Sequence, residues 1–446
     1  MRPSSKHNAS AHKPSFLKSG APAPDIDLAE RLFTEFRERT GEGRPERGVT
    51  RISYGLGEQI AHDIVQREAR RLGMRCEIDA ACNLYLVLEG REAGPGIVIG
   101  SHLDSVPKGG NFDGAAGVLA GLAVAAGFVR AGRQPMLDLT VMAIRAEEST
   151  WFGASYIGSR AAFGKLTTME LDKVSRSSDK VLLKSAIASA GGNPEALKIG
   201  SAYLSSEKVA AFIEPHIEQG PVLIEEGRAL GIVTGIRGSF RHRHARCEGQ
   251  YSHSGATPRE HRSDAVLATA HLAVALDHSW KKHAEAGHDL SVTFGQFATD
   301  RENAAFSKVA GRVDFSIDIR SENTSTLDLM RRDLVDSIAA IELEFGVRFT
   351  LGEETGSEPA KMDANLMARL SDLAKSQGLD ARAMPCGAGH DAAVFAQEGV
   401  PTAMIFIRNL NGSHNPHESM EIEDFARAAE LLAALCDTYF CSPDTK

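Results

Sequence analysis

The chain of 446 residues has few cysteines, and none of the six forms a Cys-x-x-Cys pair. Scattered cysteines argue against a disulfide framework or a thiolate zinc site, and they fit a reducing, cytoplasmic compartment. No apolar run approaches the roughly 18 residues that a membrane helix needs. With a formal net charge of -9 and no basic stripe, the chain is also a poor candidate for binding nucleic acid. These absences leave a soluble globular protein, which we expect in the cytoplasm.

The first 24 residues are rich in Ser, Pro, Lys and His. They lack the apolar core of a signal peptide and the pattern of a lipid anchor. We expect a disordered leader over residues 1–24.

From residue 25 onward, helical and strand-like segments alternate. Helical spacing of apolar residues covers 25–40, 57–73 and 115–130, whereas short apolar runs at 97–99 and 137–144 are typical of buried strands. This alternation predicts an α/β domain with a doubly wound, mainly parallel sheet. Residues 165–209 are polar and show less regular spacing.

The pattern changes near Gly227. Four strand-like segments and two long helical ones follow, and the later strands alternate apolar and polar residues as half-exposed antiparallel strands do. A helix, a strand and a closing helix then resume the first pattern. We therefore predict a catalytic domain formed by residues 25–229 and 357–446, with an inserted α+β domain at 230–356.

Polar side chains follow the apolar strands of the predicted sheet at their carboxyl ends. In open α/β sheets ligands bind in the crevice at that edge, so one site collects them all. Imidazoles and carboxylates without thiolates suit zinc, manganese, cobalt or nickel. Asp113 is a candidate bridge between two such ions. The ligand candidates are His102, Asp113, Glu147 or Glu148, His216 and His414.

Glu147 and Glu148 are adjacent and so cannot have the same role, because neighbouring side chains at a strand end point to different sides. One can bind metal while the other accepts a proton from the water that the metal activates. A single His-x-Asp or Glu-Glu pair is usually a solvated surface feature. The placement of all these ligand candidates at strand ends favours a metal site.

These motifs together resemble the binuclear metallohydrolases that include aminoacylases and carboxypeptidases. Within that group, His216-Ile-Glu-Gln-Gly220 and Gly387-Ala-Gly-His-Asp391 resemble the amidase, hydantoinase and carbamoylase family. The resemblance spans about residues 25–440. It implies two divalent metals per subunit, with His102 and His216 on different metals, Asp113 as the bridge, and Glu148 and His414 completing the two ligand sets. It further implies that Glu147 is the general acid and base, that Asp104 orients His102, and that Gln219 and His390 contact substrate.

The same resemblance implies that the inserted domain is a lid through which two subunits form a homodimer. Ser252-His253-Ser-Gly resembles the family's His-Ala-Gly motif, whose histidine reaches the partner's site and stabilises the oxyanion. Arg320 matches the arginine that grips the substrate carboxylate, and a guanidinium fork suits such a contact. Without the family context, His253 and Arg320 would be ordinary loop and strand residues.

The chain departs from the family pattern near the last lid strand. Where the family has Asn-x-x-Pro-Gly, this chain has Ser307-Lys-Val-Ala-Gly311, and Asn303 is a nearby substitute for the missing asparagine. Arg259, Arg408-Asn409 and Cys82 also replace common family residues. None of these changes touches a predicted metal ligand, but several fall among residues expected to line the substrate pocket.

The sequence thus predicts a metal-dependent amidohydrolase of linear C–N bonds, first of all an N-carbamoyl-L-amino acid hydrolase. Allantoate amidohydrolase and beta-ureidopropionase remain open, as does an N-acyl amino acid deacylase or dipeptidase with the same site. A non-catalytic binding protein on this scaffold should lack the base or a ligand, and here all are present.

Overall fold

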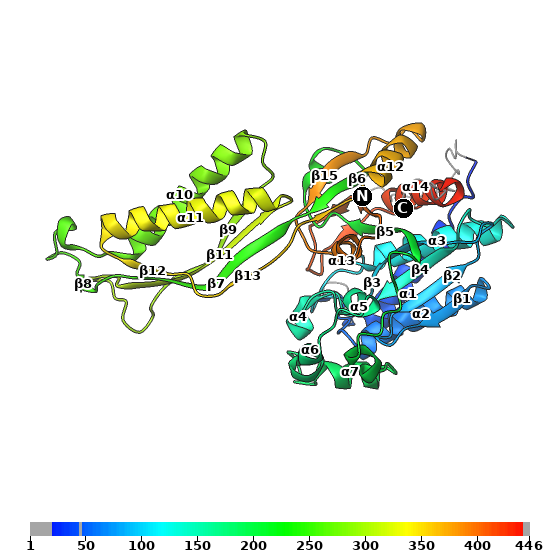
Figure 1. Cartoon of the computed structure of the whole chain (residues 1–446), viewed down its shortest axis with the longest axis horizontal. Coiled ribbons are helices and arrows are strands. Elements are labelled where there is room, and N and C mark those ends of the chain that lie inside the picture. Colours follow the sequence, from blue (N-terminus) through cyan, green and yellow to red (C-terminus); the bar gives the residue numbers. More distant parts are fainter. Residues whose placement is uncertain (1–19, 44–46, 440–446) are drawn as a thin grey trace, which may run out of the picture. The chain divides into compact units, whose positions relative to one another are not determined.

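The computed structural model describes residues 20–43 and 47–439. Residues 1–19 of the predicted leader lie outside this part of the chain, whereas Gly20–Pro24 are described and Ala21 is buried. The chain divides into two compact units (Figure 1). The first contains residues up to Gly231 with Ala368–Arg382 and Ile405 onward, and the second contains Ile232–Met367 and Ala383–Met404.

The first unit is built on a sheet whose centre is parallel. Strand β3 (Gly96–His102) lies between β4 (Leu139–Ile144) and β5 (Val209–Ile217) and is parallel to both. Beyond β4 the sheet continues antiparallel through β2 (Leu84–Leu88) to β1 (Arg75–Ile78). On the other side β5 adjoins β16 (Thr402–Ile407). The predicted α/β class with a mainly parallel central sheet is confirmed.

Helix α3 (Ala115–Arg130) is buried almost all round, and this explains its run of Ala, Gly, Val and Leu. It packs on β3, β4 and β5 and against the closing helix α14 (Ile422–Thr438). Asp25 caps α1 (Ile26–Thr40) by accepting a hydrogen bond from the Leu28 N–H. Two further long helices are amphipathic. They are α2 (Leu56–Arg71), which lies in this unit, and α12 (Ala364–Ser376), which lies mostly in it.

Residues 165–209, which lack regular spacing, contain short helices that the sequence did not predict. They are α6 (Thr168–Lys173), α7 (Leu183–Ser189) and α8 (Pro194–Lys198). Each is too short to show helical periodicity, although Thr167 and Glu170 form a capping box at the start of α6. With α4 (Ser149–Phe152) and α5 (Ile157–Ala162) they enclose a separate apolar cluster that includes Trp151, Phe152 and Leu183.

The second unit contains a five-stranded antiparallel sheet, in the order β12-β7-β11-β9 with β13 also paired to β7. Helices α10 (Ala265–Glu285) and α11 (Thr324–Phe345) lie along this sheet (Figure 1). Alternate residues of β11 are buried under them, as the sequence predicted for a half-exposed strand. The strands are β7 (Gly238–Glu248), β9 (Ser291–Thr299), β11 (Arg312–Ser321), β12 (Arg348–Thr350) and β13 (Glu354–Ser357).

Shorter elements complete the two units. In the second unit β6 (Leu230–Ile236) pairs with β14 (Ala360–Lys361) and β15 (Arg382–Cys386), β8 (Ser252–His253) pairs with β10 (Lys308–Val309), and α13 (Asp391–Gln397) follows. In the first unit α9 (Val222–Glu225) follows β5, and β17 (Asn409–Leu410) pairs with β18 (Ser419–Met420). No helix among the described residues combines the length and apolar character needed to cross a membrane.

Candidate metal centre and substrate-binding residues

The predicted metal ligands all lie in the first unit, at or beyond the carboxyl ends of its central strands. His102 is the last residue of β3, Glu148 follows β4, and His216 lies near the end of β5. Asp113 lies just before α3, and His414 lies in the loop between β17 and β18. Because β3, β4 and β5 are parallel neighbours, their carboxyl ends share one edge of the sheet.

His102, His216 and Asp113 form one buried group, so the two histidines that were expected to bind different metals lie together. Asp113 Oδ1 lies 3.6 Å from His102 Nε2 and 3.1 Å from His216 Nε2. Each imidazole bonds through Nδ1 to a backbone carbonyl, that of Asp104 at 3.0 Å and that of Ile217 at 2.9 Å. Only a protonated Nδ1 can donate to a carbonyl, so the neutral tautomer of each ring leaves the Nε2 lone pair facing Asp113. This is the usual arrangement of a metal-binding histidine.

A second group shares Asp113 with the first. His414 Nε2 lies 3.3 Å from Asp113 Oδ2 and 3.6 Å from Glu148 Oε1. Asp113 therefore turns one carboxylate oxygen toward each group, which is the geometry a bridging ligand requires. His414 is half-exposed, whereas Asp113 and Glu148 are buried.

The unpaired polar atoms at this site fit a cation. Asp113 Oδ1 is buried and has no hydrogen-bond partner within the described part of the chain. Burial and the charge of Asp113 raise the pKa of Glu148 to about 7, and the contact with Asp113 raises the pKa of His414 to about 9. The pKa shifts reflect excess negative charge held away from water, which divalent cations would balance.

Close packing of the Gly114 backbone against the His102 ring holds the first group together. Gly114 has a φ of +66°, and a Cβ at this position would lie 2.6 Å from the His102 ring. Only glycine combines that backbone conformation with the close approach of the ring. The Gly114 N–H also donates to His216 Nε2 at 3.1 Å.

Glu147 lies at the edge of the first group, with Oε2 3.9 Å from His102 Nε2. Its backbone N–H and that of Glu148 donate to the two carboxylate oxygens of Asp104, at 3.2 and 3.1 Å. Asp104, predicted to orient His102, bonds that ring through its carbonyl, while its carboxylate Oδ1 lies 3.4 Å from Nδ1. The Asp104 carboxylate therefore mainly anchors the Glu147–Glu148 backbone.

Glu58 supports the backbone just before Glu147, and sequence patterns did not reveal this role. From within α2, its fully buried carboxylate accepts hydrogen bonds from the N–H groups of Tyr54 and Ala146 and from Arg145. Ala146 has a φ of +52°, a conformation that an alanine rarely adopts without such support. No sequence signal marks Glu58, because a glutamate in an amphipathic helix is ordinarily solvated.

Gln219, the predicted substrate contact in this unit, lies beside the bridge. Its Nε2 donates to Asp113 Oδ2 at 3.2 Å, and its buried Oε1 has no partner among the described residues. An acceptor without a donor, next to the ligands, is a suitable contact for a substrate N–H.

Arg320 in the second unit is held by its strand neighbour. Asp318 accepts from Arg320 Nε and Nη2, and the Gly387 carbonyl accepts from Nη1 at 2.7 Å. Among the described residues these bonds use one N–H of each terminal nitrogen, so the other N–H of each can donate to a carboxylate. His390, three residues after Gly387, is buried at the start of α13.

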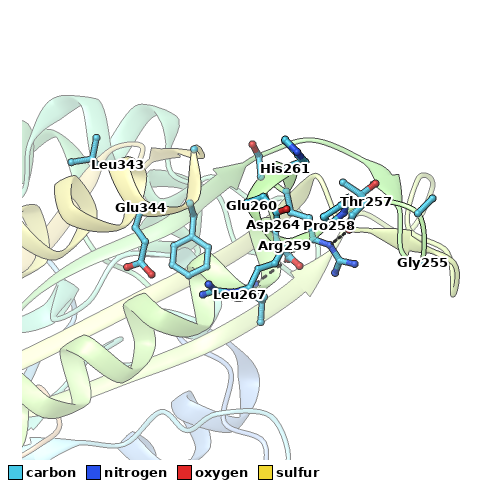
Figure 2. A pocket seen from close by; sticks show the side chains of 15 residues that line it. Gly255, Thr257, Pro258, Arg259, Glu260, His261, Asp264, Leu267, Leu343 and Glu344 are labelled. Carbon is cyan, nitrogen blue, oxygen red and sulfur yellow. Dashed lines mark hydrogen bonds between the residues drawn. The ribbon is translucent and has the colours of Figure 1, made fainter.

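His253 is exposed, and its tautomer is determined by its own loop. The N–H groups of Gly255 and Ala256 both donate to His253 Nδ1, at 3.2 Å each. Nδ1 must therefore be unprotonated, and the neutral ring carries its proton on Nε2, where it can be donated. The segment after His253 borders a cavity of about 810 Å³ together with the ends of α10 and α11 (Figure 2).

One departure from the family pattern, the stretch Ser307–Gly311, begins beside His253. The Ser307 carbonyl accepts from the Ser254 N–H, and Lys308 pairs with His253 in a two-residue ladder. Asn303 is exposed, and its amide donates to Asp300 Oδ2 at 2.7 Å. The structure thus brings Ser307 close to His253, while Asn303 is occupied within its own turn.

Comparison with known proteins shows which family the chain belongs to. Residues 98–438 match the model of peptidase family M20/M25/M40. The chain is 31% identical to the allantoate amidohydrolase of Escherichia coli (strain K12), covering 91% of this chain and 98% of that protein. It is 33% identical to an N-carbamoyl-L-amino acid amidohydrolase of Geobacillus stearothermophilus, covering 90% and 96%.

A solved structure is similar over nearly the whole chain. It is an amidase of the hydantoinase/carbamoylase family from Burkholderia multivorans, with a TM-score of 0.85 and 26% identity, covering 94% of this chain and 99% of that one. The family resemblance predicted from the motifs is confirmed. The chain therefore belongs to peptidase family M20/M25/M40 and is a hydrolase of carbon–nitrogen bonds.

Proposed function

We propose that this protein is a metal-dependent amidohydrolase that cleaves a linear ureido or amide bond, with N-carbamoyl-L-amino acids as its first candidate substrates. The observation that carries this proposal is the placement of Asp113 between two groups of ligand candidates with Glu147 beside the first. The relatives named for allantoate and for N-carbamoyl-L-amino acids support a ureido substrate.

In this proposal each group of ligand candidates would hold one ion. His102, His216 and Asp113 would hold the first, and Asp113, Glu148 and His414 the second. Zinc, manganese, cobalt and nickel all accept such ligands. Bound divalent metal lowers the pKa of water toward ~7 and polarises a carbonyl oxygen.

Glu147 is then placed to move the proton. Its carboxylate accepts a proton from the attacking water and passes it to the departing nitrogen, as a general base and then a general acid. Asp104 keeps the Glu147 backbone in place through its hydrogen bond. With an N-carbamoyl substrate the products are the free amino acid and carbamate, which breaks down to carbon dioxide and ammonia.

The substrate contacts come from Gln219, Arg320, His390 and the loop of His253. The open end of the Arg320 guanidinium suits the substrate carboxylate, and the Nε2 proton of His253 suits the oxyanion. Asn303 and Ser307 are the candidates for the position where the family has asparagine. Since the Asn303 amide already bonds Asp300, Ser307 beside His253 is the better placed of the two.

We propose that residues 230–356 act as a lid and dimerisation domain, and that His253 serves the partner subunit's site. Large apolar side chains exposed on α10 and α11 support an interface there, among them Leu267, Val274 and Leu343. Leu267 and Leu343 also line the cavity after His253 (Figure 2). We place the protein in the cytoplasm on the basis of its cysteine usage.

An ammonia-release panel tests the substrate. Metal-stripped enzyme is reloaded with each candidate ion and given N-carbamoyl amino acids, allantoate, ureidopropionate, and N-acetyl and N-formyl amino acids. We expect ammonia from the ureido compounds, with N-carbamoyl-L-amino acids the most rapidly cleaved. Release of free amino acid from the N-acyl compounds alone would instead identify a deacylase or dipeptidase.

A further inference from the structure

Glu418 is a buried carboxylate outside the predicted ligand set. It ends the loop that carries His414 and precedes β18, and only 5% of its surface is exposed. A carboxylate in such a position requires several hydrogen bonds to offset the loss of its hydration.

The hydrogen bonds of Glu418 lead to the loop of Asp113. Its Oε1 accepts from the N–H groups of Phe112 at 2.8 Å and Asp113 at 3.2 Å. The approach is so close that a Cβ at Gly110 would collide with the Glu418 carboxyl group. A residue at the end of the chain thus holds the backbone of a ligand some three hundred positions earlier.

Ser413 links the two carboxylates directly. Its hydroxyl lies 2.7 Å from Asp113 Oδ2 and 2.7 Å from Glu418 Oε2. Asp113 is therefore held twice, at its backbone N–H by Glu418 and at its carboxylate by Ser413. The carboxylate oxygen that Ser413 contacts is the one that faces His414.

We propose that Glu418 and Ser413 are positioning residues that hold Asp113 in its bridging orientation; the proposal rests on the proposed metal centre. A bridge requires Oδ1 to face His102 and His216 while Oδ2 faces His414, and rotation of the carboxylate would break one group or the other. The pair also ties the loop of His414 to the loop of Asp113. Neither residue touches the proposed ions or the substrate, so their effect reaches the metal through Asp113.

Metal affinity in the absence of substrate tests this proposal. Full-length protein is stripped with a chelator and titrated with zinc or manganese alone by calorimetry. Glu418→Leu keeps the volume and loses every hydrogen bond, so we expect about 10–100-fold weaker binding, the usual effect of removing a residue that supports a metal ligand. Glu418→Gln can still accept from the backbone and donate to Ser413, so its affinity should stay within about threefold of the original.

Ser413→Ala keeps the test decisive if Glu418→Leu does not fold. It removes only the hydroxyl, and we expect weaker metal binding with an unchanged unfolding temperature of the metal-free protein. Glu68→Gln is the control, because Glu68 is a buried carboxylate on α2 whose partners among the described residues are Arg31, Arg67 and Arg71 rather than a ligand candidate.

The proposal would be overturned if Ser413→Ala, or a folded Glu418→Leu, bound metal as tightly as the unsubstituted protein. An equal loss of metal affinity in Glu68→Gln would also overturn it. These outcomes do not depend on turnover. An enzyme that cleaves no ureido compound but loses metal affinity in these variants would contradict the proposed substrate and leave the positioning role standing.

Discussion

The ligand loops of the first unit and the substrate residues of the second differ in how firmly they are held. Asp113, Glu147 and Glu148 are buried, and buried carboxylates behind them bond their backbone N–H groups. His253 and Asn303 are exposed, and the side-chain hydrogen bonds that the structure gives them stay within their own loops. If these residues have the roles proposed above, the groups for the reaction are held firmly by the fold, whereas those for substrate selection are held by fewer contacts.

Removing the metal should have the largest effect. We expect dialysis against a chelator to abolish amidohydrolase activity, because the proposed reaction needs a divalent cation to lower the pKa of the attacking water and to polarise the carbonyl. Activity should return when zinc, manganese, cobalt or nickel is added, as measured by ammonia release. Full activity in protein shown to be metal-free by elemental analysis would contradict the metal centre.

Glu147→Gln should have the next largest effect on activity. The amide cannot accept a proton, so we expect kcat to fall by about 10²–10⁴-fold, the usual contribution of a general acid and base. Metal content should be retained, since Glu147 is not an assigned ligand. Glu195→Gln, at an exposed position, is the control. If Glu147→Gln keeps its turnover, the proposed proton path is wrong.

Arg320→Lys should have a smaller effect that falls on binding. A lysine offers no fork, so we expect KM for an N-carbamoyl amino acid to rise about 10–100-fold, as for loss of a charge-assisted hydrogen bond of 1.5–3 kcal/mol. Arg312→Lys is a close control, because Arg312 lies on the same strand and pairs with Asp314 just as Arg320 pairs with Asp318. Equal effects in both variants would show that the loss is structural.

Asn303→Ala should have the smallest effect. Its amide bonds Asp300 within its own turn and not the substrate, so we expect kcat/KM to change by less than about threefold, which is about 0.7 kcal/mol. A loss of more than tenfold, with stability unchanged, would show that Asn303 leaves its turn to bind substrate. The contrast between the two units would then be smaller than it now appears.

Much of the fold could be predicted because its elements carry strong periodic signals. Helices α1, α3, α10 and α11 and the central strands occur where the spacing of apolar residues placed them. The short helices α6, α7 and α8 could not be predicted, since each spans fewer than two turns and is stabilised by the cluster around Trp151. Local pattern identifies elements only when they are long enough to repeat it.

The sequence by itself determined which residues gather at the carboxyl edge of the sheet, because parallel strands bring the residues that follow them to one place. The set of His102, Asp113, His216 and His414 with either Glu147 or Glu148 could be assembled on that ground, and the family resemblance then chose Glu148. Only the tertiary structure decided how Asp113 divides its oxygens between two groups, and which carboxylates hold it. Those contacts join residues up to 306 positions apart, and no local pattern encodes the angle at which such distant side chains meet.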